Sequence, residues 1–189
     1  MNRSTFLLLL IVAVINPVIA EDQALRDRVE ALLTHVDELL EQGKARTAII
    51  ELKNAAREVP NDPGIRERLG LIYLQSGQLE QAAKELKRAH THGANGRRLI
   101  TALSSVLIQI GQHEQAFVLL QSVEYPSPEL LALRADARWK HGDVDGAKAD
   151  YDAALKRDPK LLPALLGHAR LAQRKGTVQD ALLWANRAV

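Results

Sequence analysis

Two short stretches of the chain carry residue types that could bind a metal ion. GDVDGAKAD, residues 142–150, places Asp143 and Asp145 two residues apart, as in a calcium-binding loop. Such a loop needs acidic ligands at positions one, three and five and a glycine at position six, and here the glycine comes too early. His90 and His92 are also two residues apart, and helical side chains at that spacing do not face the same way. We therefore predict that residues 142–150 cap the start of a helix and that the chain binds no metal.

Catalytic signatures are missing from the sequence. It contains no cysteine nucleophile, no serine in a G-x-S-x-G turn and no glycine-rich phosphate loop. His35 and His168 occupy a helix-packing position, where a packing role explains a histidine better than catalysis does. We predict that the protein is not an enzyme and holds no cofactor.

The composition indicates a helical protein. Ala and Leu dominate and aromatic residues make up only 4%, a mixture that favours helix over strand. The chain has 25 basic and 23 acidic residues, and the resulting net charge of +2 gives no electrostatic case for binding nucleic acid. We predict an all-α fold and no nucleic-acid partner.

The N-terminus has the pattern of a secretory signal. Arg3 precedes an unbroken apolar run from Phe6 to Ile15, and Ala20 ends a stretch of small residues. Ten helical residues span about 15 Å, half the thickness of a bilayer core, so a membrane-spanning helix is not expected. We predict that residues 1–20 are a signal peptide, with an uncleaved membrane anchor as the alternative, and that residues 21–189 are exported, in bacteria to the periplasm. Without cysteine, the exported chain would have neither disulfides nor a lipid anchor on an N-terminal cysteine.

The rest of the chain is a repeat. Glycines recur every 34 residues, apart from one interval of 31, and an alanine follows each glycine by five residues. The glycines are Gly43, Gly77, Gly111, Gly142 and Gly176, and the alanines are Ala48, Ala82, Ala116, Ala147 and Ala181. Apolar residues at spacings of three and four on both sides of each glycine predict two helices joined by a short turn.

The repeat units are 29–62, 63–96, 97–127, 128–161 and an incomplete unit at 162–189. The expected helix pairs are 24–42 with 45–58, 63–76 with 79–91, 97–110 with 113–123, 128–141 with 144–157, and 162–175 with 178 to the end. Turns this short make the two helices of a pair antiparallel neighbours.

Small residues recur where two helices of a unit must approach closely. Position 8 of the units holds Val36, Gly70, Ser104, Ala135 and Ala169, and position 20 is always the alanine. We expect these two positions to face one another, so that a leucine at Gly70 would overpack the contact. The glycine at position 15 suits a left-handed helix C-terminus.

Two places depart from the regular repeat. Pro126 and Pro128 predict that the second helix of the third unit ends early and that the superhelical curvature changes there. The sequence stops inside the last helix, and we expect the native chain to continue beyond Val189.

The repeated residues resemble the tetratricopeptide repeat (TPR). Leu69, Gly70, Tyr73, Gly77, Ala82 and Ala89 match its pattern, as do Gly142, Ala147, Tyr151, Ala154 and Pro159. The resemblance implies an α-solenoid, a right-handed superhelix of antiparallel helix pairs, that acts as a protein-interaction scaffold. Residues 44–63 and 132–172 also resemble the exported multi-TPR protein of the PEP-CTERM/exosortase sorting and exopolysaccharide systems of Gram-negative bacteria.

In TPR arrays the first helix of each unit lines a concave groove. At the corresponding positions the early units offer Glu30, Asp37, Glu41 and Glu67, and the later units offer Arg98, Trp139, Lys140, Arg170 and Arg174. We predict that the second set binds a protein or peptide partner, with simple solvated polar positions as the alternative. The lysine and asparagine of the known carboxylate clamp are not matched, since Leu33 and Asp37 stand there.

The sequence thus favours a non-enzymatic interaction scaffold in the bacterial cell envelope, linked to exopolysaccharide production or protein sorting. It would reach a membrane only through an associated complex or an uncleaved N-terminal segment. The alternatives are a module that binds or guides polysaccharide and an adaptor in outer-membrane assembly.

Overall fold

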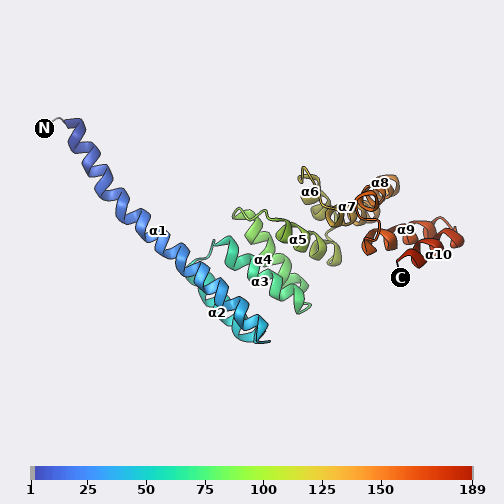
Figure 1. Cartoon of the computed structure of the whole chain (residues 1–189), viewed down its shortest axis with the longest axis horizontal. Helices are drawn as coiled ribbons and strands as arrows, with labels where there is room; N and C mark the ends of the chain where they lie inside the picture. The colour runs from blue at the N-terminus through green and yellow to red at the C-terminus, as the bar shows by residue number, and fades with distance from the viewer. Residues whose placement is uncertain (1–2, 189) are drawn as a thin grey trace.

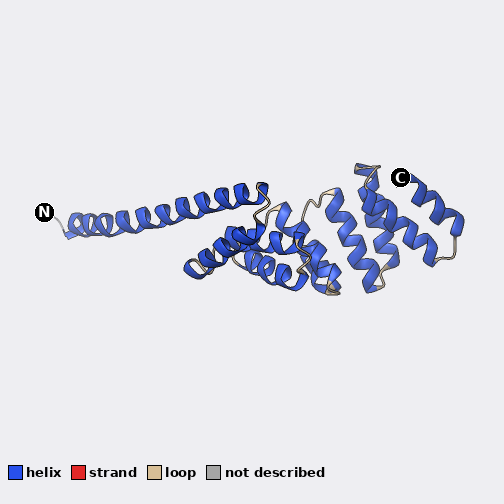
Figure 2. Cartoon of the chain, turned by 90° about the horizontal axis from the view of Figure 1, so that it is seen from below, coloured by secondary structure: helices blue, strands red, loops and turns tan. Residues whose placement is uncertain are grey.

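The computed structural model describes residues 3–188, and these form ten α-helices joined by short turns (Figure 1). The helices are α1 (Arg3–Glu41), α2 (Ala45–Glu58), α3 (Pro63–Gln75), α4 (Leu79–Thr91), α5 (Arg97–Gln109), α6 (His113–Gln121), α7 (Pro128–His141), α8 (Val144–Arg157), α9 (Leu162–Arg174) and α10 (Val178–Arg187). Consecutive helices pack as pairs along one axis, and every described element is helical (Figure 2). The predicted all-α solenoid of helix pairs is confirmed, with most boundaries within one residue of those expected.

Helix α1 is the main departure from the expected spans. It begins at Arg3 rather than at residue 24, so the expected signal segment continues the first repeat helix (Figure 1). Leucine and alanine favour helix, and no turn separates this segment from the repeat. The part of α1 that packs on α2 lies at its C-terminal end, where Val36 and Leu39 are buried. Across the described residues, no helix combines the length and hydropathy that crossing a membrane would require.

The turn glycines adopt the left-handed conformation, as predicted. Their φ angles are +73° at Gly43, +71° at Gly77, +80° at Gly111, +96° at Gly142 and +76° at Gly176. At Gly77 the turn closes with two backbone hydrogen bonds, Gly77 N–H to Leu74 O at 3.0 Å and Gln78 N–H to Tyr73 O at 2.8 Å. These two hydrogen bonds satisfy backbone carbonyls at the end of the helix. The turn that forms them needs a residue that tolerates a positive φ angle, such as glycine.

Gly70 marks a close helix contact, although its nearest neighbour differs from the one expected. A Cβ built at Gly70 would lie 2.5 Å from Leu86 Cγ and 2.8 Å from Leu86 Cδ2, so Leu86 on α4 occupies the space that a side chain would need. The close contact expected at Gly70 is therefore confirmed, with Leu86, one turn beyond Ala82 on α4, as its nearest neighbour, and the facing of Gly70 and Ala82 stays a prediction. Ala82 and Ala147 are themselves fully buried, as small position-20 residues should be.

The third unit is irregular, as the prolines predicted. Helix α6 has nine residues and ends at Gln121, two residues before the expected end. The buried residues of the array form two clusters that meet at α7. Leu130 and Ala137 on α7 belong to the first cluster, whereas Leu131 and Ala135 belong to the second. The change in superhelical curvature at this place stays a prediction.

Candidate partner-binding groove

The first helices of the units form the inner side of the array. Helices α1, α3, α5, α7 and α9 contact one another in series, whereas among the described residues the successive second helices make no such contact. In a curved stack of helix pairs the helices that approach one another lie on the inside of the curve. The first helices therefore line one side of the array, which is called the groove below, and its role as a concave partner-binding surface stays a prediction.

Two adjoining hollows lie on this side and share Leu71 and Arg98. One lies between α3, α5 and the start of α7, with Leu71, Leu74 and Ala102 among its apolar lining residues. The other lies between α1, α3 and α5, where Leu33, Glu67 and Arg68 join Leu71 and Arg98. Of the predicted partner-binding residues, Arg98 is placed in this groove.

The charged side chains around the hollows differ in whether the chain itself pairs them. Arg68 Nη2 donates to Asp37 Oδ2 at 2.8 Å, an ion pair that joins α3 to α1. Asp37 is therefore not a free groove carboxylate, and the predicted acidic end of the groove is partly neutralised. Arg98 is exposed and lies outside every ion pair among the described residues.

Glu129 stands at the other rim of the first hollow, in the first turn of α7. The Ser127 hydroxyl, followed by the backbone N–H of Glu129 itself, lowers the pKa of this carboxyl, and the nearby Arg97 adds to the effect. The carboxylate therefore stays ionised at neutral pH. Arg97 and Glu129 both line the hollow beside Arg98.

Trp139, Lys140 and Arg170 come together in space, but not as an open docking surface. Lys140 Nζ lies 5.1 Å from the centroid of the Trp139 ring, and the Arg170 guanidinium carbon lies 5.4 Å from it. Arg170 also forms an ion pair with Asp136 and donates to the Tyr151 hydroxyl at 3.3 Å. The three predicted residues therefore connect α7 to α9, and the Trp139 ring is engaged by two cations of the chain itself.

Asp136 and Tyr151 complete this cluster and were not identified from the sequence. The Tyr151 hydroxyl donates to Asp136 Oδ1 at 2.6 Å. Burial, and then the Asp136 carboxylate, raise the pKa of Tyr151 well above its usual value. The phenol therefore stays protonated and acts as a hydrogen-bond donor. Arg174, the last predicted groove residue, is exposed near the end of α9.

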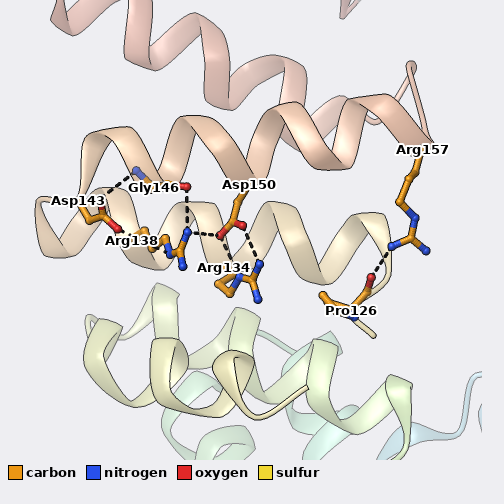
Figure 3. Close-up of polar contacts among 7 residues, drawn as sticks. All are labelled: Pro126, Arg134, Arg138, Asp143, Gly146, Asp150 and Arg157. Atoms are coloured by element: carbon orange, nitrogen blue, oxygen red, sulfur yellow. Dashed lines mark hydrogen bonds and ion pairs between the residues drawn. The ribbon is translucent and has the colours of Figure 1, made fainter. Parts of the chain in front are cut away.

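A second polar cluster fastens α7 to α8 (Figure 3). Arg134 donates to both oxygens of the buried Asp150, at 2.9 and 2.7 Å, and Arg138 Nη1 lies 3.2 Å from Asp150 Oδ2. The Arg134 guanidinium has a raised pKa, chiefly because of its hydrogen bonds to Asp150. All three side chains are used within the unit, so we assign this cluster a structural role.

The two histidines that were predicted to pack behave differently. His168 is 4% exposed and stacks on Trp184, with ring centroids 4.3 Å apart and an interplanar angle of 15°. His35 is exposed and lies near Glu38 and Glu51, so its packing role is wrong. The difference arises because α9 is covered by α8 and α10, whereas His35 lies at the exposed edge of the contact between α1 and α2.

The two stretches first considered for metal binding have local roles at helix ends. Asp143 Oδ1 accepts from Gly146 N–H at 2.9 Å, which confirms the predicted N-cap of α8. A Cβ at Gly146 would lie 2.6 Å from Asp143 Cγ, so the cap depends on that glycine. His90 Nδ1 lies 3.1 Å from Ala94 O, just beyond the end of α4.

Comparisons with known proteins agree with this architecture. Two family models described as "Tetratricopeptide repeat" match residues 39–104 and 133–189, which together make up more than half of the chain. No curated protein sequence matches the chain.

Solved structures with the same fold are similar over most of the chain. A MamA fragment from Desulfovibrio magneticus RS-1 has a TM-score of 0.73 and 18% identity, covering 84% of this chain and 92% of its own. YrrB, described as a TPR protein with an unusual peptide-binding site, has a TM-score of 0.71 and 18% identity, covering 83% and 82%. A tetratricopeptide repeat protein from Parabacteroides merdae has a TM-score of 0.70 and 23% identity, covering 84% and 64%.

At these identities the solved structures establish the fold and leave the ligand open. The repeat register, the left-handed glycine turns, the serial contact of first helices and the two family matches agree with one another. The chain belongs to the tetratricopeptide repeat proteins.

Proposed function

We propose that this protein is a non-enzymatic scaffold that holds an extended segment of a protein partner in the concave groove around Arg98. The observation that carries the proposal is the composition of the two adjoining hollows. They combine apolar side chains of α3 and α5 with charged groups, of which all but Arg68 form no ion pair within the described chain.

The groove offers both kinds of contact that a peptide needs. Leu71 and Ala102 present the little apolar surface that the array leaves uncovered there, with Leu74 beside them. Arg98 is exposed and can turn its guanidinium toward a ligand without breaking an ion pair. Apolar contact supplies affinity, and a charged partner for Arg98 would add orientation and selectivity.

The comparison with YrrB supports a peptide ligand by analogy of fold. YrrB is described as having a peptide-binding site on the same kind of array. A polysaccharide ligand would call for an open aromatic surface, and the Trp139 ring is already engaged by Lys140 and Arg170. We therefore favour a protein partner over a polysaccharide.

The groove can be tested by capture of partners from a bacterial envelope extract. The bait would be the whole chain, compared with its Arg98→Glu variant and with Arg46→Glu, which reverses an exposed arginine on the second helix α2. We expect Arg98→Glu to lose the partners that the wild type and Arg46→Glu retain. Retention of all partners by Arg98→Glu would refute groove binding.

For the cellular setting we propose the bacterial envelope, with a role in exopolysaccharide production or protein sorting. The proposal rests on the N-terminal pattern up to Ala20 and on the resemblance of residues 44–63 and 132–172. Mass spectrometry of the protein from fractionated cells would locate it and define its first residue. A periplasmic chain that begins at Glu21 would support the proposal, and a cytoplasmic chain that retains Met1 would contradict it. An adaptor role in outer-membrane assembly would instead bring outer-membrane assembly proteins out of the same capture experiment.

A further inference from the structure

Three successive first helices present charges of alternating sign to the groove. Glu67 on α3 and Arg98 on α5 line one hollow together, and Arg98, Arg97 and Glu129 line the next. Along the concave side the order is therefore acidic, basic, acidic. None of these four side chains belongs to an ion pair among the described residues, although the Glu129 carboxylate already accepts a hydrogen bond from Ser127.

Ion pairs of the chain itself bound this series on both sides. Asp37 on α1 is held by Arg68 on α3, and Asp136 on α7 is held by Arg170 on α9. Each pair joins neighbouring first helices and neutralises a charge that would otherwise face the groove. Between these two pairs lie the four unpaired charges that line the hollows, from α3 to the start of α7.

The spacing of the helices sets the spacing of the ligand charges. Packed helices lie about 8–10 Å apart. An extended peptide advances about 3.3 Å per residue. A peptide that crosses the first helices therefore passes one groove charge for about every three of its residues.

We propose that the groove selects an extended segment whose charges run basic, acidic, basic at intervals of three residues, with its acidic residue at Arg98. An apolar side chain next to the acidic residue would lie over Leu71 and Ala102. The charge order is the same in both chain directions, so the selection does not depend on the direction in which the peptide lies. This inference rests on the proposed function, because it names the kind of segment that the same groove would hold.

Three fluorescein-labelled nonapeptides of equal length test the inference, and the first and third have the same composition. The first has lysine, glutamate and lysine three residues apart, with leucine beside the glutamate. The second reverses the three charges, and the third keeps the first composition but places the charged residues side by side. Fluorescence anisotropy with the whole chain should show the first peptide binding about ten-fold more tightly than the others, a difference of about 1.4 kcal/mol.

A charge exchange provides the sharper test. Arg98→Glu should weaken binding of the first peptide by about ten-fold. A peptide with lysine in place of the glutamate should bind the Arg98→Glu variant about as tightly as the first peptide binds the wild type, and it should not bind the wild type tightly. Arg46→Glu should behave as the wild type with every peptide. Circular dichroism would establish that both variants keep the helical fold.

The outcomes separate the inference from the proposed function. If all three peptides bind equally and Arg98→Glu weakens their binding, the proposed order and spacing of charges is wrong, whereas peptide binding in the groove still holds. Peptide binding that is insensitive to Arg98→Glu would overturn both. No binding of any peptide, alongside Arg98-dependent capture of a protein partner, would overturn the extended segment and keep the scaffold.

Discussion

Gly167 on α9 lies directly against the ring of Tyr151 on α8. A Cβ built at Gly167 would fall 2.7 Å from Tyr151 Cε2 and closer still to the ring's Cζ atom. The ring is 1% exposed, and its hydroxyl is held by Asp136 on α7. Tyr151 therefore connects the fourth unit to the fifth, and the missing side chain at Gly167 makes room for it.

Gly167→Ala should destabilise the array even though alanine favours helix. The new methyl group would displace the Tyr151 ring, and overpacking of this kind costs about 1–3 kcal/mol. Urea unfolding followed by circular dichroism would measure the change in the free energy of unfolding. The matched experiment repeats the substitution in a Tyr151→Leu background, where the cost should disappear. An equal cost in both backgrounds would show that the ring is not the cause.

Arg66→Met should remove a buried ion pair that fastens α3 to its neighbours. Arg66 Nη1 lies 2.8 Å from Glu85 Oε2, and the same guanidinium donates to Pro60 O at 2.9 Å and Ala56 O at 3.1 Å. Breaking one side of such a pair costs about 3–5 kcal/mol, and the buried Glu85 would keep only the longer contact to the more exposed Arg88, at 3.6 Å.

Thermal and urea unfolding of Arg66→Met, with Arg46→Met as the exposed control, would measure this loss. The double variant Arg66→Met/Glu85→Leu should recover most of the stability, since it removes both buried charges. A double variant as unstable as Arg66→Met would mean that the two backbone carbonyls, rather than Glu85, account for the loss.

Stability should fall on mild acidification because of His168. Burial lowers the pKa of this histidine below its usual value of 6.5, against the opposing effect of Asp152. Lys148 and Arg187 also face it and lower its pKa further. The folded state favours the neutral ring. The contribution of His168 to the free energy of unfolding is therefore complete above pH 6.5, and it is lost as the pH falls through the folded-state pKa.

The free energy of unfolding of wild type and His168→Phe, measured between pH 8 and pH 5, checks this prediction. Phenylalanine keeps a ring beside Trp184 and cannot take a proton, so the difference between the two proteins should change with pH in that range. Trp184 fluorescence would report the stack directly. A difference that stays constant with pH would contradict the assignment to His168.

Arg157→Ala should loosen the connection between the third and fourth units. Arg157 Nη1 donates to Pro126 O at 2.6 Å and so ties the end of α8 to the loop before α7 (Figure 3). Loss of one hydrogen bond of about 1 kcal/mol corresponds to about five-fold faster local amide exchange. Hydrogen–deuterium exchange of residues 122–127 would detect this change, with Lys156→Ala as the neighbouring control. Equal exchange in the two variants would count against a role for Arg157.

Much of the architecture could be predicted from the sequence because its signals are local. The helix pairs follow from apolar spacing, and each turn follows from a glycine such as Gly77 that must adopt positive φ. Pro126 and Pro128 likewise predicted that α6 is short, since neither can continue a helix. The extension of α1 to Arg3 was missed, because a signal-like pattern describes processing and does not preclude helix.

The candidate site was predicted only in part. The sequence placed Arg98 on the groove side, where the structure also has it. The sequence also predicted Arg170 as a partner-binding residue, but in the structure Arg170 forms an ion pair with Asp136 and donates to the Tyr151 hydroxyl. Repeat positions say which face a side chain occupies, but not whether an ion-pair partner from another unit already holds it.

The sequence by itself determined the repeat, its helices and its turns, because propensity and spacing act within a few residues of the chain. Only the tertiary structure decided which charges remain available. Asp37 meets Arg68 across 31 residues and Asp136 meets Arg170 across 34, so each pair depends on how neighbouring units pack. Arg98 has no such partner among the described residues, and the packing of α3, α5 and α7 leaves its side chain exposed beside the hollows.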